Sequence, residues 1–170
     1  RLLVEELEPG APGQSTGKTI AENTLRCKAI VKNLLDYARE SEVQMRLSDL
    51  NEIARSSVQM LANEMRIHNI EHRLELAESL PKVSCDRNQI QQVFVNLLQN
   101  AIQAIENHGQ ITVFTSSAKG GDGVLFGVRD NGVGIRAEAL FRVFEPFYTT
   151  KEKGTRLGLS ICYGIVRRHN

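Results

Sequence analysis

The chain has 170 residues, a formal net charge of +1, an apolar content of 41% and a charged content of 24%. These values are ordinary for a globular protein and predict no electrostatic surface for nucleic acid. No apolar run approaches the roughly 20 residues of a membrane span, so no membrane contact is expected, and the glutamates near the start argue against a signal peptide. Three widely spaced cysteines disfavour a disulfide framework or a zinc site and favour the cytoplasm, with any membrane anchor of the intact protein expected upstream.

The first 40 residues predict helices. Residues 1–8 read as the last turns of one helix, which the Pro and Gly residues of 9–13 end. Residues 18–40 read as a single long helix with a 3.5-residue apolar period, which is typical of a coiled coil or helical bundle. An amphipathic helix packed on its own domain is the alternative. The inner positions are Ile20, Thr24, Cys27, Val31, Leu34 and Ala38.

Residues 41–170 predict a second domain. A helix begins at a capping box of Asp49 and Glu52 and runs to about Met65. A strand follows at 67–76, its apolar positions alternating along one face.

The next helix is capped by Asp86 and Gln89 and runs to about Asn107. Its apolar face is predicted to comprise Ile90, Phe94, Leu97, Leu98, Ala101, Ile102 and Ile105.

The remaining segments complete the predicted sheet. A strand at 111–115 is joined by a glycine-rich hairpin at 120–123 to a buried strand at 124–128. A long irregular stretch, about 136–155, precedes a last helix at 157–169. Helices and mostly antiparallel strands predict an α+β fold, a two-layer α/β sandwich.

The stretch from Asp130 to Ile135 carries the strongest functional signal. An acidic residue at a strand end, followed by Gly132 and Gly134, lets the backbone close around a small planar ligand. The carboxylate can accept a hydrogen bond from an exocyclic amine. Taken alone, Asp-Asn-Gly is also a common turn.

Amides on the helix at 86–107 form a second candidate element. Asn96, Asn100 and Gln103 share one stripe, and a hydrated Mg²⁺ carrying phosphates would give these amides partners. A solvated polar edge is the alternative for these side chains.

The segments before the last helix supply phosphate-binding features. Gly154 and Gly158 flank a helix N-terminus, where free N–H groups favour an anion, and Thr155 can add a hydroxyl. The irregular stretch at about 136–155 contains an aromatic-rich segment at 140–148 and is predicted to be a lid, because about 20 irregular residues in a compact domain are usually functional. The alternatives are a loop that merely starts a helix and, for Phe144 and Phe147, simple core packing.

Four motifs in order identify a resemblance to sensor histidine kinases that covers nearly the whole chain. Residues 96–104 resemble the N box, 130–135 the first glycine box, 144–147 the F box, and 154–160 the second glycine box. Residues 18–40 resemble the second helix of the dimerisation hairpin. The Tyr-Thr-Thr-Lys sequence at 148–151 resembles the nitrogen-regulation subtype.

The resemblance implies a Bergerat-type ATP-binding fold at 41–170, preceded at 1–40 by part of a dimerisation hairpin. Asp130 would hold the adenine amine, and Asn100, assisted by Asn96, would ligate Mg²⁺. Asn96, Asn100 and Lys151 would be the catalytic residues. The expected nucleotide-binding residues are Asn100, Ala104, Asp130, Gly132, Gly134, Ile135, Phe147, Thr150, Lys151, Gly154, Thr155, Leu157, Gly158 and Leu159.

The implied reaction is phosphoryl transfer from ATP to a histidine and then to an aspartate of a response-regulator receiver domain, in a homodimer. ATP-hydrolysing relatives carry a glutamate where this chain has Asn96, and an amide cannot act as a general base. The site therefore suits phosphoryl transfer better than hydrolysis.

The sequence departs from the family pattern in three places. The phosphoacceptor histidine is missing, and none of His68, His72, His108 and His169 is assigned that role. Arg156 replaces a glycine, and it could either crowd the phosphate loop or pair with a phosphate. The family's further C-terminal strands are absent, so a hydrophobic sheet edge is expected to be exposed.

These departures keep two other hypotheses open. One is a non-catalytic dimerisation and interaction module with impaired nucleotide binding. The other is a protein-serine kinase or ATPase of the same superfamily, which Asn96 and the dimerisation-type helix disfavour.

Overall fold

The computed structural model describes residues 16–17, 19–21, 23–24, 43–118, 120, 123–146, 148 and 157–169. The described residues between 16 and 24 are helical, and the rest of the helix predicted at 18–40 lies outside the described part, as does the helix end predicted at 1–8. In the described part, no helix combines the length and apolar character needed to cross a membrane.

The first long helix, α3, spans Leu50–Ile67 and begins as predicted. Its N-cap Asp49 accepts hydrogen bonds from the backbone N–H groups of Asn51 (2.8 Å) and Glu52 (3.3 Å), which satisfies two of the free donors at the helix start. The Glu52 carboxylate lies 3.4 Å from the guanidinium of Arg87 on the neighbouring helix.

The second long helix, α4, spans Arg87–Ala104 and has the predicted N-cap, Asp86. The Asp86 carboxylate accepts from the backbone N–H groups of Asn88 (2.9 Å) and Gln89 (3.2 Å). The predicted end near Asn107 is wrong, because Ile105 already has an extended backbone (φ −99°, ψ 118°). Most of the predicted apolar face is buried, together with Val93, which the prediction omitted.

A three-stranded sheet contains β2 (Ile70–Leu76), β4 (Gly109–Ser117) and β5 (Val124–Asp130) in the order β2-β4-β5. The β4–β5 pair is antiparallel and joined by the predicted hairpin, whereas β2 and β4 are parallel. A separate antiparallel pair joins β1 (Arg46–Ser48) to β3 (Val83–Cys85). The expectation of mostly antiparallel strands therefore holds, with β2–β4 as the exception.

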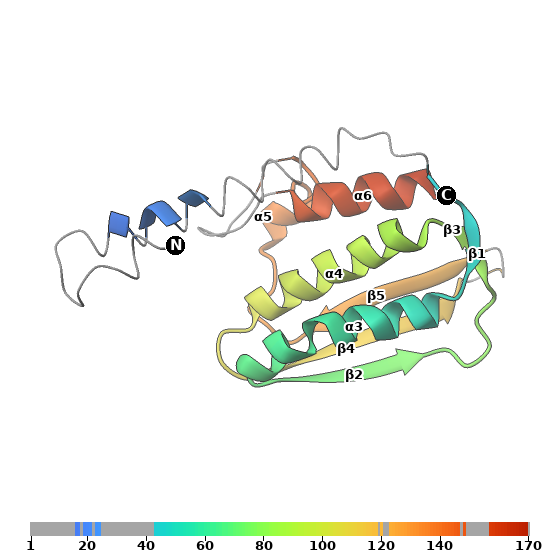
Figure 1. The fold of residues 1–170 in the computed structure, drawn as a ribbon, viewed down its shortest axis with the longest axis horizontal. Helices are drawn as coiled ribbons and strands as arrows, with labels where there is room; N and C mark the ends of the chain where they lie inside the picture. Colours follow the sequence, from blue (N-terminus) through green and yellow to red (C-terminus); the bar gives the residue numbers. More distant parts are fainter. Residues whose placement is uncertain are drawn as a thin grey trace.

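The helices form one layer and the three-stranded sheet the other (Figure 1). Helices α3 and α4 lie across one face of the sheet, and α6 (Gly158–Arg168) packs beside α4. The core between the layers includes Ile53, Met65, Phe94, Leu98, Ile111 and Val113, each fully buried. The predicted two-layer α+β fold is confirmed.

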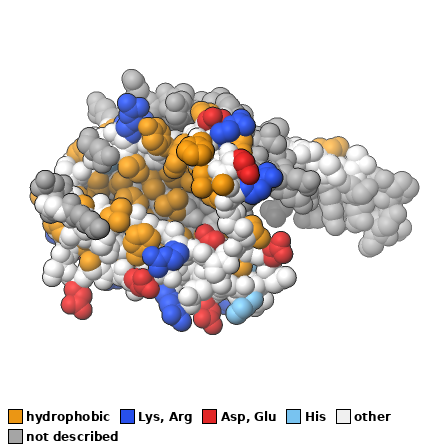
Figure 2. Space-filling model, turned by 180° about the vertical axis from the view of Figure 1, so that it is seen from behind, with side chains coloured by type: hydrophobic (Ala, Val, Ile, Leu, Met, Phe, Trp, Pro, Cys, Tyr) orange, Lys and Arg blue, Asp and Glu red, His pale blue; other side chains and the backbone are white. Residues whose placement is uncertain are grey.

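The outer strands are more exposed than predicted. Strand β5, expected to be buried, is half-buried, and Leu125 on it is 55% exposed. Among the described strands β5 forms one edge of the sheet, as the expectation of an exposed edge requires. Figure 2 shows a broad area of hydrophobic side chains on the back of the molecule.

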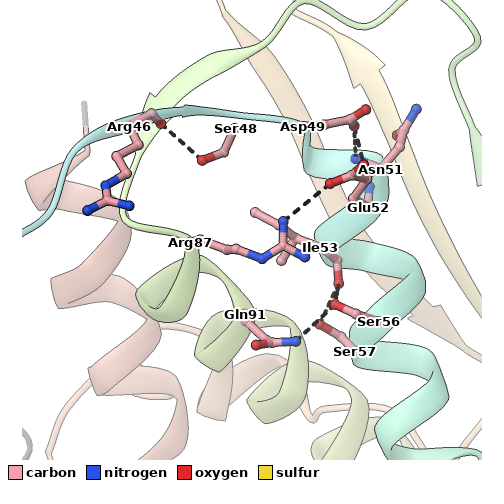
Figure 3. A network of polar contacts seen from close by, with 10 residues as sticks. All are labelled: Arg46, Ser48, Asp49, Asn51, Glu52, Ile53, Ser56, Ser57, Arg87 and Gln91. Atoms are coloured by element: carbon pink, nitrogen blue, oxygen red, sulfur yellow. Dashed lines mark hydrogen bonds and ion pairs between the residues drawn. The ribbon is translucent and has the colours of Figure 1, made fainter.

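Buried and half-buried polar groups connect the elements. The Thr115 hydroxyl donates to Oδ1 of Asn51 (2.7 Å) and accepts from the backbone N–H of Ala77 (3.1 Å). Between the helices, the Gln91 amide donates to the Ser56 hydroxyl (2.9 Å), as Figure 3 shows. These bonds join α3 to the sheet and to α4.

His68 and His72 lie on different elements. His68 is the C-cap of α3 and not a strand residue as expected, while His72 lies on β2. The described residues contain no group of three or more His, Cys, Asp and Glu side chains that could hold a metal ion. His169 has a structural contact, because its Nε2 accepts from the backbone N–H of Asp86 (3.0 Å).

Candidate nucleotide-binding site

The amide stripe of α4 faces the start of α6. A Cβ built on Gly158 would lie 3.9 Å from Nδ2 of Asn100 and from Cγ of Asn96, and 4.0 Å from Oδ1 of Asn96. Two segments that are about 60 residues apart in the chain, the N box and the second glycine box, therefore meet here. Gln103, the third member of the predicted stripe, is exposed.

The Asn96 side chain is oriented with its oxygen toward Gly158 and its nitrogen toward the protein. Its Nδ2 is buried and, within the described part of the chain, makes no hydrogen bond of ordinary geometry, although the thiol of Cys162 lies beside the side chain. This burial excludes a solvated edge for Asn96. A buried polar atom without a partner is costly in a native structure, and a catalytic role or a bound ion is one explanation for it.

The thiol of Cys162 lies beside Asn96. Burial raises the pKa of this thiol from its ordinary 9.0 to about 11, and the neighbouring Asn96 side chain acts in the opposite direction. The sulfur also lies 3.9 Å from the carbonyl oxygen of Val93. Cys162 is therefore a protonated, packed side chain behind the amide and no nucleophile.

The N-terminus of α6 suits an anion. Its N-cap is Leu157, whose buried side chain has no oxygen to accept a hydrogen bond from the first N–H groups of the helix. Free N–H groups and the helix dipole favour a phosphate at this end. Asn96 and Asn100 supply amide oxygens nearby, the type of ligand that Mg²⁺ accepts, although Asn100 presents its nitrogen to Gly158 and would have to turn its amide to ligate a cation.

The acidic residue of the first glycine box ends β5, as predicted. Asp130 is exposed, and its Oδ1 accepts from the backbone N–H of Gly132 (2.9 Å) in an Asx turn. This bond fixes the carboxylate relative to the turn that follows it.

The two glycines of this turn are required for different physical reasons. A Cβ on Gly132 would lie 2.4 Å from the carbonyl oxygen of Ala104, so only glycine permits this approach to the end of α4. The same carbonyl accepts from the backbone N–H of Val133 (3.0 Å). Gly134 has a positive φ of 72°, which glycine adopts without strain.

The segment after the turn is helical in part and exposed. Helix α5 spans Ala137–Leu140, within the stretch expected to be irregular. Phe144 is 51% exposed and its ring centroid lies 5.7 Å from that of Tyr163 on α6, so simple core packing is wrong for Phe144. The Arg142 guanidinium pairs with Glu145 (3.1 Å) and lies over the ring of Tyr148 (4.4 Å to the centroid).

The predicted residues fall into four groups. Helix α4 and α6 bring Asn96, Asn100 and Gly158 together, while Ala104, Asp130, Gly132 and Gly134 cluster at the C-terminal end of α4. Along α4, Asn96 and Ala104 are separated by about 12 Å. Ile135 is half exposed, Leu157 buried and Leu159 partly buried. The other predicted site residues, Phe147, Thr150, Lys151, Gly154 and Thr155, lie outside the described residues, as does Arg156.

Sequence reasoning missed two contacts of this site. It assigned no role to Cys162, because a lone cysteine on an apolar helix face has no local signal. It also gave Asn131 no role beyond the turn, although the Asn131 side chain accepts from the backbone N–H of Gln110 (2.8 Å).

Comparison with known proteins agrees with this geometry. Residues 85–170 match the family described as histidine kinase-, DNA gyrase B- and HSP90-like ATPases. The chain is 32% identical over 169 residues to the sensor histidine kinase ZraS of Escherichia coli (strain K12), with 99% of this chain and 36% of that protein covered. It is 35% identical over 150 residues to sporulation kinase E of Bacillus subtilis (strain 168), with 88% of this chain and 20% of that protein covered. The chain thus spans about a third or less of these relatives.

Solved structures show the same fold. The catalytic domain of histidine kinase ThkA matches with a TM-score of 0.66 at 34% sequence identity. The match covers 75% of this chain and 82% of the ThkA domain. ThkA in complex with the response regulator TrrA has a TM-score of 0.78 at 29% identity, with 99% of this chain and 48% of that chain covered.

Proposed function

The chain belongs to the family of histidine kinase-, DNA gyrase B- and HSP90-like ATPases and carries the ATP-binding catalytic domain of a sensor histidine kinase, and on this basis we propose how its residues bind ATP and Mg²⁺. The proposal rests on one observation above all: the amides of Asn96 and Asn100 face Gly158 at the start of α6. This arrangement joins cation ligands to a phosphate-binding helix end. A full-length histidine kinase named ShkA was solved with AMPPNP, at 25% identity and a TM-score of 0.76, which supports a nucleotide at this site.

The adenine is assigned to the other end of α4. Asp130 accepts a hydrogen bond from the exocyclic amine, while Gly132 and Gly134 shape the backbone around the base. The roughly 12 Å of helix between Asn96 and Ala104 suits a ligand with a base at one end and phosphates at the other. The other residues are assigned to this ligand from their motifs alone: Ile135, Phe147, Thr150, Lys151, Gly154, Thr155, Leu157 and Leu159.

In this assignment the residues of the site position the phosphoryl group, and Asn96 does not act as a general base. Asn96 and Asn100 would hold Mg²⁺, which neutralises charge on the phosphates when bound. The N-terminus of α6 orients the phosphates and Lys151 adds a positive charge beside them. Because Asn96 is an amide, water is not activated, and the γ-phosphoryl passes to a histidine and from there to an aspartate of a receiver domain.

The partners follow from the same assignment. Residues 1–40 form part of a dimerisation hairpin and 41–170 the catalytic domain, so the intact protein is a homodimer in the cytoplasm. The ThkA structure with the response regulator TrrA supports a receiver domain as the partner to which the phosphohistidine passes its phosphoryl group. The nitrogen-regulation subtype remains a prediction from residues 148–151.

Nucleotide binding is tested by calorimetry with ADP and Mg²⁺. We expect the chain to bind and Asp130→Ala to weaken binding by about tenfold or more, the value of a hydrogen bond to a charged group. Glu106→Ala, which removes an exposed carboxylate just after α4, is the control and should leave affinity unchanged. No heat with the unmodified chain would favour the non-catalytic interaction module.

Phosphoryl transfer is tested with γ-labelled ATP. The chain alone should remain unlabelled, because it lacks the phosphoacceptor, and a separately supplied histidine-bearing dimerisation helix should acquire the label. Replacing Asn100 with Ala should abolish this transfer. Label on the isolated chain would contradict the assignment of the acceptor.

A further inference from the structure

The side chain of Asn131 connects the turn after β5 to the beginning of β4. Its Oδ1 accepts a hydrogen bond of 2.8 Å from the backbone N–H of Gln110. Gln110 is the second residue of β4, and Ile111 beside it pairs in register with Asp130. The bond therefore lies immediately next to the carboxylate to which the adenine is assigned.

The space around this bond requires glycine at position 109. A Cβ on Gly109 would lie 2.6 Å from Oδ1 of Asn131 and 2.8 Å from Cγ2 of Ile105. Gly109 is buried, so neither neighbour can move far without disturbing the end of α4. The Asn131 amide thus occupies a fitted position and is not an adventitious surface contact.

The opposite side of the turn is held by α4. Gly132 approaches the carbonyl of Ala104 closely, and the backbone N–H of Val133 donates to the same oxygen. The turn is therefore attached at two points, to β4 through Asn131 and to α4 through Gly132 and Val133. Asp130 directly precedes both attachments in the chain.

We infer that Asn131 is a positioning residue for the base, which fixes the direction of the Asp130 carboxylate relative to the amides on α4. The inference rests on the proposed function of Asp130. With the Asn131 bond lost, the turn keeps its attachment to α4 and Asp130 stays paired with Ile111, but the residue after Asp130 is no longer held to β4. The carboxylate then samples directions that do not meet an exocyclic amine, and preference for adenine falls.

The test compares ADP with IDP, in which a carbonyl replaces the exocyclic amine. Calorimetry with Mg²⁺ on the 170-residue chain gives the ratio of the two affinities for the unmodified protein and for Asn131→Ala. We expect Asn131→Ala to lower this ratio about two- to fivefold, the range for one exposed hydrogen bond. Asn131→Asp, which keeps an acceptor for the Gln110 N–H, should preserve the ratio.

Two further variants separate positioning from stability. Asn107→Ala removes an exposed amide from the preceding turn and should leave the ratio unchanged. Gly109→Ala should lower the ratio by displacing the Asn131 side chain, and the double variant with Asn131→Ala should lose less than the sum of the two single effects. A variant that only lowers the melting temperature would shift both affinities together and leave the ratio constant.

The outcomes are distinct. If the unmodified chain does not discriminate ADP from IDP, or Asp130→Ala leaves discrimination intact, the adenine assignment itself is wrong. If Asp130→Ala abolishes discrimination while Asn131→Ala and Asn131→Asp both retain it, the positioning role of Asn131 is refuted and the proposed function stands.

Discussion

The buried thiol of Cys162 links the pH dependence of stability to the site. Its pKa is about 11 in the folded protein, against an ordinary value of 9.0, so the unfolded chain loses this proton first as pH rises. The stabilisation is complete below about pH 9 and is lost as pH rises toward 11. The thiol should therefore be inert to alkylation at neutral pH.

We expect the unfolding free energy to fall between pH 8 and 10.5 by about 2 kcal/mol more in the unmodified protein than in Cys162→Ala. Urea unfolding of both proteins at several pH values measures this difference, since other ionising groups are common to the two. Parallel pH profiles would show that Cys162 does not titrate with a raised pKa.

Individual residues also show which contacts can be predicted from neighbouring residues in the sequence and which cannot. Asp49 and Asp86 were predicted as caps because an N-cap needs only its own side chain and the next residues, and both are confirmed. Asn131 could not be predicted, because its partner, Gln110, is brought near only by the pairing of β4 with β5.

Strand β4 depends on a polar contact that α3 supplies. Thr115 both donates to Asn51 and accepts from the backbone N–H of Ala77, and it is almost fully buried. Replacing it with the similarly shaped valine leaves a buried acceptor and a part-buried donor without partners.

We expect Thr115→Val to lower the unfolding free energy by about 1–3 kcal/mol in denaturant titrations. Thr112→Val is the matched control, since Thr112 is also buried on β4 but, within the described structure, its hydroxyl makes no hydrogen bond. A similar loss in both variants would attribute the effect to shape and not to the network.

The boundaries of elements show why periodicity alone was insufficient. The apolar pattern of α4 continues through Ile105, so the sequence predicts a helix to about Asn107. The helix ends at Ala104 because Ile105 has an extended backbone, and the carbonyl of Ala104 accepts from the backbone N–H of Val133 instead of continuing the helix. The parallel pairing of β2 with β4 was likewise not predicted, because no local feature encodes a partner across an intervening helix.

The arrangement of the layers was predictable from the four motifs and the apolar patterns, and the family, the fold and the presence of a catalytic ATP-binding domain are confirmed. The roles of the individual site residues stay predictions, and Lys151 and the glycine-rich loop at 151–156 lie outside the described residues. The exposed edge strand β5 has a consequence for the solution behaviour of the protein.

We expect Leu125→Lys to reduce self-association at high concentration, because exposed apolar edge strands pair with other chains and a charge opposes this. Sedimentation velocity over a concentration series measures the change. Leu47→Lys, which changes a 74% exposed leucine on β1 in the other sheet, is the control. Equal effects of both substitutions would mean that edge pairing through β5 is not involved.

The glycine that begins α6 allows stability and ligand binding to be uncoupled by a single methyl group. A Cβ at position 158 would meet both amides only at ordinary contact distance, so Gly158→Ala fits without a clash and should raise the unfolding free energy by about 0.5 kcal/mol through helix propensity. The same methyl group would occupy space between the amides and the bound phosphates. We expect a protein that melts at the same temperature or higher, yet binds ADP with Mg²⁺ about tenfold more weakly; undiminished affinity in calorimetry would place the phosphates elsewhere.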